Sequence, residues 1–474
     1  MTLSEDLIRS VVQEVLSQMG GPATNGISHT PVPTSRLGVY PTADAAVSAA
    51  EAAFEPYRRR PLADRRKVVE CIKRICVDQA EELGRMELEE TRIGRLDHKI
   101  EKLRIAIPLV PGVEHLRTDN DAGDNGLTLT DYAPFGVIGA ITPVTHSLPT
   151  LAGNAINMLA AGNTVVFNAH PSGARVAAEG VRRFNRAIRE AIGLEDLLTI
   201  IETPTLESAA ALFDHRGVRL LVVTGGPAVA RAALASKRRA IVAGPGNPPV
   251  VVDGTADLEL AAKSIIAGAA YDNNLLCIGE KQVFAVAEIF DRLLEAIGRH
   301  GGFRLQPGQI DALTRAAFKP GEGGKLQVNK DLIGQDPAVL GRHAGVEVPR
   351  GTQILFGETG ADHAFVDNEQ MMPFVPFVRV ASLDRAIELA KTSEHGYGHT
   401  AVLHSRDTGV MSRMGKAMDC TIFVINGPST AGLGLGGEGT LSFSIAGPTG
   451  EGVTTPLTFC RQRRTSVIGG MRFL

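Results

Sequence analysis

The sequence predicts an α/β protein built from doubly wound, largely parallel sheets. From residue 127 onward, short β-branched runs alternate with alanine-rich stretches, a pattern typical of successive strand–helix–strand units. Glycine is abundant, at 52 of 474 residues, and tight strand-to-helix turns need residues that readily adopt positive φ. The length exceeds that of one compact domain, so two or three domains are expected.

The predicted elements follow this alternation along the chain. Residues 43–106, rich in Ala, Arg, Glu and Leu, are predicted to be mostly helical. The first group of predicted buried strands comprises residues 136–142, 164–168, 197–201, 218–224 and 250–253. The helices predicted between them are residues 154–161, 174–192 and 228–237. A second strand–helix pattern has strands near residues 283–286, 374–380 and 421–424.

The two ends of the chain have patterns of their own. Residues 3–19 place apolar side chains at three-to-four spacing and predict an amphipathic helix, which the Gly/Pro/Thr/Ser-rich residues 20–35 follow as a flexible linker. Such a helix docks on its own globule or in a groove of a partner protein, and we favour the partner. Acidic residues on its polar face argue against a membrane-surface helix. The turn-rich last thirty residues predict an extended strand that completes a neighbouring subunit's sheet.

The composition excludes several classes of partner. A formal net charge of −3 creates no global field that attracts nucleic acid or an anionic membrane. No run reaches the roughly 18 consecutive apolar residues of a membrane helix. The cysteines are odd in number and widely scattered, and no CxxC pair suggests zinc. We therefore expect a cytoplasmic protein with no metal site, no nucleic-acid partner and no membrane segment.

Two places in the chain have the composition of a chemical site. The predicted strand at 218–224 runs into Gly225, Gly226 and Pro227 and then a helix. This arrangement leaves free N–H groups and a positive dipole end that suit a pyrophosphate, although many such turns bind nothing. Cys277 lies in the Asn-rich junction YDNNLLCIGEK. Most lone cysteines are buried and inert, but polar junctions between elements are where functional side chains tend to lie.

Several longer segments carry a resemblance to a known family. They are GVIGAITPVTHSLPT, AAGNTVVFNAHPS, VVTGGPAVARAAL, AGPGNPPVVV, NNLLCIGEK and NEQMMPFVPFVRV. They occur in the order of the aldehyde dehydrogenase superfamily. Residues 37–474 resemble its CoA-acylating branch, the propionaldehyde and acetaldehyde dehydrogenases of bacterial microcompartments.

The resemblance implies an aldehyde dehydrogenase-like architecture of two doubly wound α/β domains and a small β oligomerisation segment. It divides the chain into an encapsulation-type amphipathic helix (1–19), a linker (20–36), a Rossmann-like NAD-binding domain with an oligomerisation hairpin near 116–133 (37–246), a catalytic domain (247–440) and a C-terminal oligomerisation segment (441–474). It also implies a homodimer or homotetramer in the cytoplasm, inside a bacterial microcompartment, with a shell protein as the partner of the N-terminal helix.

The resemblance places Cys277 on the family's catalytic cysteine. Its thiolate is expected to attack the aldehyde and to hold the acyl group as a thioester after hydride transfer to NAD. The Cys277 backbone N–H and a side chain of the TPVTH segment are expected to stabilise the oxyanion. That side chain is His146, where the superfamily usually has Asn. Imidazole also donates a hydrogen bond, and a structural histidine that caps a turn is the alternative.

Cofactor-binding residues are implied by the same motifs. They are Thr142, Pro143, Asn168, His170, Pro171, Thr224, Gly225, Gly226, Gly244 and Glu369. Asn168 follows a strand where the family binds the adenosine ribose, and it has no charge for a 2′-phosphate, which favours NAD over NADP. Glu369 matches the glutamate that contacts the nicotinamide ribose, and a surface carboxylate in a loop is the alternative.

The absence of the glutamate that hydrolytic members use as a base indicates that a thiol, rather than water, accepts the acyl group. Hydrolytic members activate water with a glutamate, and a gapless reading of AGPGN places Ala243 at that position. No Asp or Glu occurs between Thr224 and Asp253, so we expect no acidic group beside the sulfur that could deprotonate water. A thiol with a pKa of about 8.5 is already partly thiolate at neutral pH and needs less help.

We therefore expect the chain to convert a short aldehyde, NAD and coenzyme A into an acyl-CoA and NADH. Propanal is the first candidate substrate and acetaldehyde the second. The alternatives are a hydrolytic or phosphorylating aldehyde dehydrogenase, or a catalytically degenerate, shell-associated protein.

Overall fold

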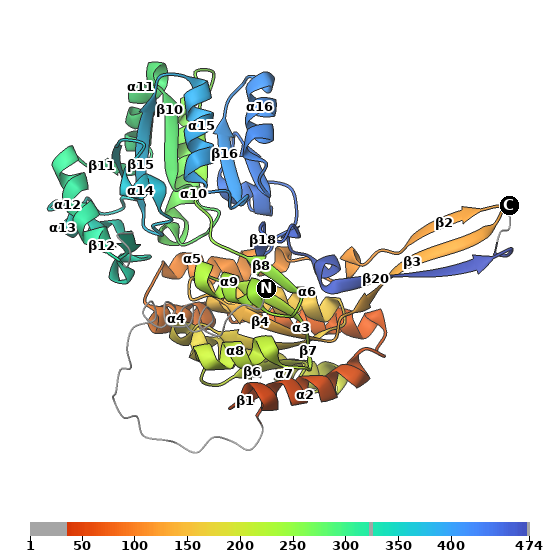
Figure 1. Cartoon of the computed structure of the whole chain (residues 1–474). Coiled ribbons are helices and arrows are strands. Elements are labelled where there is room, and N and C mark those ends of the chain that lie inside the picture. Colours follow the sequence, from red (N-terminus) through yellow and green to blue (C-terminus); the bar gives the residue numbers. More distant parts are fainter. Residues whose placement is uncertain (1–35, 322–325, 472–474) are drawn as a thin grey trace, which may run out of the picture. The chain divides into compact units, whose positions relative to one another are not determined.

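The computed structural model describes residues 36–321 and 326–471, so the predicted helix at 3–19 lies outside the described residues. The described chain forms two compact units (Figure 1). The first unit contains residues 36–91, 102–244 and 440–471, and the second contains residues 92–101, 245–321 and 326–439. The observed division at 244/245 lies near the expected 246/247. However, the expected domains follow one another along the sequence, whereas residues 92–101 join the second unit.

The first unit is built on a six-stranded parallel sheet in the order β1-β6-β5-β4-β7-β8. The strands are β1 Val39–Tyr40, β4 Val137–Thr142, β5 Thr164–Ala169, β6 Leu198–Ile201, β7 Val218–Thr224 and β8 Ala240–Ala243. β4, β5, β6 and β7 lie at the predicted β-branched runs. Their parallel pairing confirms the prediction of a doubly wound sheet.

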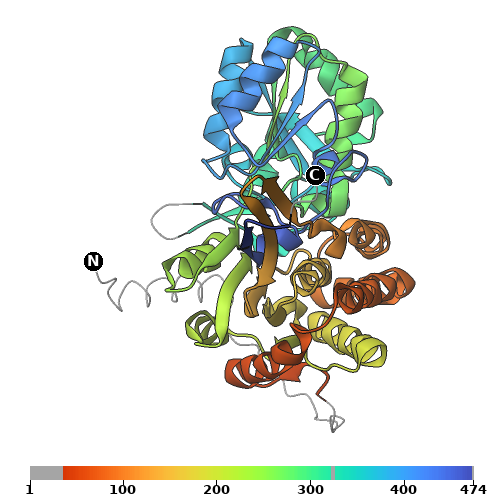
Figure 2. The ribbon, with the colours of Figure 1, turned by 90° about the vertical axis from the view of Figure 1, so that its right-hand side faces the viewer.

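Helices cover both faces of this sheet, which explains why its central strands are buried on both sides. The helices are α2 Ala43–Tyr57, α3 Leu62–Asp78, α4 Ala80–Thr91, α6 Ser147–Ala160, α7 Ala174–Ile192, α8 Leu206–Asp214 and α9 Pro227–Ala235. α2 and α8 pack together on one face, whereas α3, α6 and α7 pack together on the other (Figure 2). α7 has the predicted bounds and ends at Gly193, whose left-handed φ of 70° terminates the helix.

The second unit is built on a seven-stranded parallel sheet in the order β11-β14-β15-β10-β9-β16-β17. Its strands are β9 Pro249–Val252, β10 Gln282–Val286, β11 Gly302–Arg304, β14 Ile354–Glu358, β15 Phe374–Val380, β16 Thr400–His404 and β17 Ile422–Ile425. Its helices are α5 Leu96–Glu101, α10 Leu258–Ala270, α11 Ala287–Arg299, α12 Pro307–Ala317, α13 Pro337–His343, α14 Ala364–Asp367, α15 Leu383–Ser393 and α16 Thr408–Met418. β9, which the sequence pattern grouped with the first sheet, pairs with β10 and β16 of the second.

Three antiparallel strands of the first unit form a ribbon, called here the arm (Figure 1). They are β2 Asp119–Gly123, β3 Gly126–Pro134 and β20 Cys460–Ile468. β20 pairs with β3 of its own chain from Cys460 opposite Pro134 to Ile468 opposite Gly126. The C-terminal strand therefore forms on the expected segment, but its hydrogen-bonded neighbour in this sheet is the chain's own hairpin.

Candidate active site

The residues predicted to bind a cofactor gather at the switch point of the first sheet. The chain builds β5 and β6 on one side of β4 and then adds β7 and β8 on the other. Ligands of open α/β sheets bind outside the carboxyl ends of the strands at such a point. The predicted residues that lie at or just beyond these ends are Thr142, Pro143, Asn168, His170, Pro171, Thr224, Gly225, Gly226 and Gly244.

Two of the three polar side chains at this edge of the sheet are hydrogen-bonded, and the third, a buried hydroxyl, is not. The Thr224 hydroxyl lies 2.6 Å from that of Ser444, and Asn168 Oδ1 accepts a hydrogen bond of 2.6 Å from Ser208. Thr142 Oγ1 is buried and makes no hydrogen bond. Buried polar atoms are rarely left unsatisfied, so an additional hydrogen-bonding group at this edge fits the residues present.

The turn between β7 and α9 has the features of an anion site. Gly226 precedes the nine-residue α9, and Pro227 occupies its first turn. The first backbone N–H groups of a helix have no intrahelical partner and carry the positive end of its dipole. A Cβ on Gly226 would meet no atom within 4 Å, so the backbone there is open to a ligand. A pyrophosphate fits this turn, because its negative charge suits the positive end of the helix dipole and the backbone at Gly226 is open to a ligand.

His146 lies just before α6 and is buried, with 5% of its surface exposed. Its side chain makes no hydrogen bond that caps α6. Instead, its Nδ1 lies 2.8 Å from Nζ of the buried Lys102. The next backbone N–H, that of Ser147, donates to the buried Glu87 at 3.1 Å. Both the ring and the backbone of this segment are thus held by charged side chains.

Cys277 belongs to the second unit and follows a tightly wound loop. Asp272, Asn273 and Asn274 all have positive φ, between 49° and 65°. Such a run is costly for residues other than glycine, and the local contacts offset the strain. Asp272 accepts a hydrogen bond from the Arg95 backbone at 2.7 Å, and the Asn273 amide donates to the Gly334 carbonyl at 2.9 Å.

Lys281 holds residues 272–281 together from within; this segment is called here the nucleophile loop, after the role expected for Cys277. The fully buried Lys281 ammonium donates to the carbonyl oxygens of Asn274 at 2.7 Å and Leu276 at 3.0 Å, and also to the Asn274 side chain. These partners lie on the N-terminal side of Cys277, whereas Lys281 lies on the C-terminal side. The loop is therefore closed by a charge-assisted network rather than by apolar packing alone.

Cys277 is half-buried as a residue, and its thiol is surrounded by protein. Burial first, and the charge of Glu369 second, raise the pKa of the thiol to about 12, while Lys281 opposes this shift. Burial also raises the pKa of Glu369, and hydrogen bonding from the Gly246 backbone lowers it. Glu369 therefore acts electrostatically on the thiol, whereas the absence of Asp and Glu from residues 225–252 predicted no such acidic group. Glu369 itself is half-buried. The carboxylate comes from a segment distant in sequence.

Two further neighbours of Cys277 were not predicted. A Cβ on Gly246 would lie 2.4 Å from the Cys277 carbonyl oxygen and 3.0 Å from Cγ of His399. His399 is buried, its Nε2 has no hydrogen-bond partner, and its Nδ1 lies 2.9 Å from the Thr400 hydroxyl. Burial and then Lys281 lower the pKa of His399 to about 4, so the ring is neutral at neutral pH. No local pattern marks this histidine, because 122 residues separate it from Cys277.

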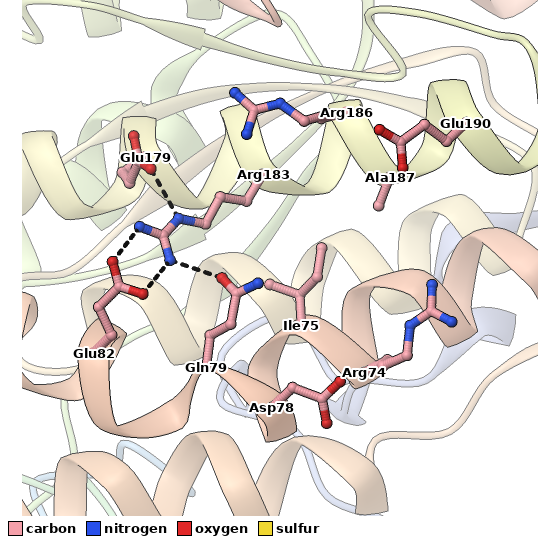
Figure 3. Close-up of a pocket in the computed structure, with 10 residues that line it drawn as sticks. All are labelled: Arg74, Ile75, Asp78, Gln79, Glu82, Glu179, Arg183, Arg186, Ala187 and Glu190. Atoms are coloured by element: carbon pink, nitrogen blue, oxygen red, sulfur yellow. Dashed lines mark hydrogen bonds and ion pairs between the residues drawn. The ribbon is translucent and has the colours of Figure 1, made fainter.

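A surface pocket on the first unit does not belong to this constellation (Figure 3). It lies between α3, α4 and α7 and is lined mainly by charged side chains. Arg183 at its centre already bonds Glu82 at 2.7 Å, Glu179 at 2.8 Å and Gln79 at 2.7 Å. These groups neutralise one another, and the lining holds no nucleophile. Within residues 36–321 and 326–471, no cluster of His, Cys, Asp and Glu suits a metal ion, and no helix is long and apolar enough to span a bilayer.

Comparison with known proteins gives consistent matches. The model of the aldehyde dehydrogenase family matches residues 22–301. The acetylating acetaldehyde dehydrogenase of Salmonella typhimurium is 41% identical, with 100% of each chain covered. A Rhodopseudomonas palustris propionaldehyde dehydrogenase, solved with bound CoA and an acylated cysteine, has 43% identity and a TM-score of 0.88, covering 91% of this chain and 98% of that one. A propionaldehyde dehydrogenase from the fucose utilisation microcompartment of Clostridium phytofermentans has 38% identity and a TM-score of 0.89, covering 92% and 99%.

Proposed function

Because the chain belongs to the aldehyde dehydrogenase family, we propose that it is an NAD-dependent, CoA-acylating enzyme that converts a short aldehyde into its acyl-CoA. The observation that carries this proposal is the nucleophile loop, where a partly exposed cysteine is clamped by Lys281 and packed against Gly246. The relatives act on acetaldehyde or propionaldehyde by name. Propanal and acetaldehyde are therefore the candidate substrates.

Cys277 is the proposed nucleophile. Its thiolate forms a bond to the aldehyde carbon, and the carbonyl oxygen becomes an oxyanion that the Cys277 backbone N–H and His146 are proposed to stabilise. NAD, when bound, supplies the hydride acceptor that turns this adduct into a thioester. The CoA thiolate then attacks the thioester carbon, and the Cys277 sulfur leaves as thiolate. A relative with an acylated cysteine and bound CoA supports this order.

The carboxyl edge of the first sheet is the proposed NAD site. Thr142 and the β7–α9 turn fit a pyrophosphate-containing ligand by their unsatisfied hydroxyl and open helix end. Asn168 is uncharged, which favours NAD over NADP. Glu369 is proposed to contact the nicotinamide ribose.

His399 is proposed to hydrogen-bond the incoming thiol, since it offers a neutral imidazole next to the nucleophile loop. The His399→Ala variant tests this role. Without CoA, it should still release a single burst of NADH per active site, because formation of the thioester is unaffected. Turnover with CoA should fall. An equal loss of burst and turnover would argue against a specific role in acyl transfer.

The carboxylate of Glu369 gives the hydrolytic alternative a concrete basis, since a glutamate near the thioester is the group that hydrolytic members use. Ala243 at the usual glutamate position, and the acylating relatives, favour CoA. Product identification decides between the two. Propanal, NAD and CoA should yield propionyl-CoA and NADH in equal amounts. Free propionate formed at the same rate without CoA would identify a hydrolase, and NAD binding without turnover would indicate a degenerate site.

The proposed location is the interior of a bacterial microcompartment, as for the Clostridium phytofermentans relative. The amphipathic pattern at residues 3–19 makes this segment the proposed contact with a shell protein. Deleting residues 1–20 should preserve turnover and abolish co-localisation with co-expressed shell proteins. Unchanged co-localisation would refute the targeting role.

A further inference from the structure

Lys102 and His146 form a buried pair within the first unit. Lys102 Nζ lies 2.8 Å from His146 Nδ1, and 1% of the lysine and 5% of the histidine are exposed. Lys102 begins the π-helical turn Lys102–Ala106, whereas His146 lies at the start of α6. The pairing therefore joins two elements 44 residues apart in sequence.

The chemistry of the donor determines the state of the ring. A lysine ammonium has three donors and no acceptor, so Nδ1 must be the acceptor in this hydrogen bond. A neutral imidazole that accepts at Nδ1 carries its proton on Nε2. Lys102 therefore selects the tautomer in which Nε2 is a hydrogen-bond donor.

The backbone around the ring is fixed separately. Glu87, fully buried on α4, accepts a hydrogen bond of 3.1 Å from the Ser147 N–H. The Ser147 hydroxyl donates to the Gly173 carbonyl at 3.0 Å. Burying charged side chains is expensive, and well-packed apolar residues are often equally stabilising. Lys102 nevertheless occupies a buried position against the histidine ring.

We propose that Lys102 is a positioning residue that holds His146 as its Nε2–H tautomer, so that the ring presents a donor to the oxyanion. This inference rests on the proposed function for its catalytic consequence. The superfamily's usual asparagine always carries N–H donors in its amide group, but a histidine donates from a given nitrogen only in one tautomer. The replacement of Asn by His at position 146 therefore needs a group that fixes the proton, and Lys102 supplies it.

The tautomer can be measured independently of activity. Protein carrying ring-¹⁵N histidine is sedimented and studied by magic-angle-spinning NMR, and the His146 signals are identified by their loss in His146→Asn. In the native protein, the His146 ring should be protonated on Nε2 and not on Nδ1. The same state is expected in Lys102→Arg, because the arginine side chain also has donors and no acceptor. Lys102→Met should show Nδ1–H or a mixture. Lys73→Met is the matched control, because Lys73 donates to the carbonyls of Pro108 and Val110 instead, and it should leave the His146 signals unchanged.

Kinetics add a second, linked readout. Lys102→Met should lower kcat roughly 10- to 100-fold, by analogy with the loss of a group that orients a metal-bound histidine, and Lys102→Arg should recover part of the loss. In the His146→Asn background, Lys102→Met should change kcat less than about threefold, because the amide needs no tautomer control. Equal losses in both backgrounds, or an unchanged Nε2–H ring in Lys102→Met, would overturn the proposal.

Two further outcomes remain informative. If Lys102→Met does not fold, the spectrum of the native protein still tests the proposal, because a His146 ring protonated on Nδ1 would contradict the proposed Nε2–H tautomer. If the native protein forms no acyl-CoA, the proposed function fails, whereas the NMR comparison still tests the control of the tautomer.

Discussion

Gly246 lies so close to Cys277 that a Cβ on the glycine would come within 2.4 Å of the cysteine's carbonyl oxygen. The same atom would lie 3.0 Å from Cγ of His399. The contact with the carbonyl oxygen is far shorter than a van der Waals distance, and the contact with the buried ring is tight. The glycine is thus required by the close approach of the backbone to the nucleophile loop.

Gly246→Ala should therefore displace the nucleophile loop and lower kcat about 100-fold, as expected for a misplacement of about 1 Å at the reacting group. Steady-state NADH formation from propanal and CoA measures the effect. Gly308→Ala is the control in the same unit, because its Cβ would meet no atom within 4 Å. Full activity in Gly246→Ala would mean that the loop has other conformations that work equally well.

A pair of glycines in helices gives opposite predictions for stability. A Cβ on Gly268 of α10 would lie 1.8 Å from Oε2 of the buried Glu280, whereas one on Gly298 of α11 would meet nothing within 4 Å. Gly268→Ala should lower the free energy of unfolding by about 1–3 kcal/mol through overpacking. Gly298→Ala should raise it by about 0.5–1 kcal/mol, because alanine has the higher helix propensity.

Denaturant unfolding of both glycine variants measures the difference. Stabilisation by Gly268→Ala would show that Glu280 can leave its bonds to the Ser429 backbone N–H and hydroxyl, both 2.8 Å, without cost.

Local patterns in the sequence predicted the central strands of the first sheet and several of the second, but not β1, β8, β11, β14 or β16, nor the separate helices of the second unit. β-branched runs marked β4, β5, β6 and β7, and the apolar stripe of α7 gave its bounds. The grouping of the cofactor residues of the first unit came from the family resemblance, and the strand order of the sheet shows why their strand ends meet at one edge.

Contacts between distant segments left no such local signal. Glu369 reaches Cys277 across 92 residues, and the absence of acidic residues near Ala243 gave no indication of it. The three left-handed residues before Cys277 were equally hidden, because Asp and Asn also occur in ordinary turns. His399 and Lys102 likewise acquire their roles only from the residues that the fold packs against them.

The reactivity of Cys277 should depend on pH in a direction set by its neighbours. Its pKa is raised to about 12 by burial and Glu369 and is lowered by Lys281. The reactive thiolate is therefore a small fraction at neutral pH and grows as the pH rises. Alkylation by iodoacetamide, corrected with Cys277→Ser, should accelerate steadily from pH 7 to 9 without a plateau.

Two variants test the causes of this pKa shift. Glu369→Gln removes a negative charge, so the pKa should fall and alkylation at pH 8 should accelerate. Lys281→Met removes the opposing positive charge, so the pKa should rise and alkylation should slow. A plateau near pH 8 in the native protein would mean that the thiol is much more acidic than its surroundings predict.

The arm carries apolar side chains that the described residues leave exposed. Leu129 on β3 is 43% exposed, and Val467 and Ile468 on β20 are 40% and 82% exposed. A three-stranded ribbon with exposed apolar residues is unusual for a monomer, and a second copy of the chain is the partner we propose for it. The double variant Leu129→Asp with Ile468→Asp should therefore have a lower mass in solution than the native protein, which we expect to be a dimer or tetramer, because burying two carboxylates in the contact is costly. Light scattering coupled to size-exclusion chromatography measures the mass, and Leu260→Asp, at a site that is also 43% exposed but lies on α10, is the matched control. An unchanged mass in the double variant would exclude the arm from the subunit contact.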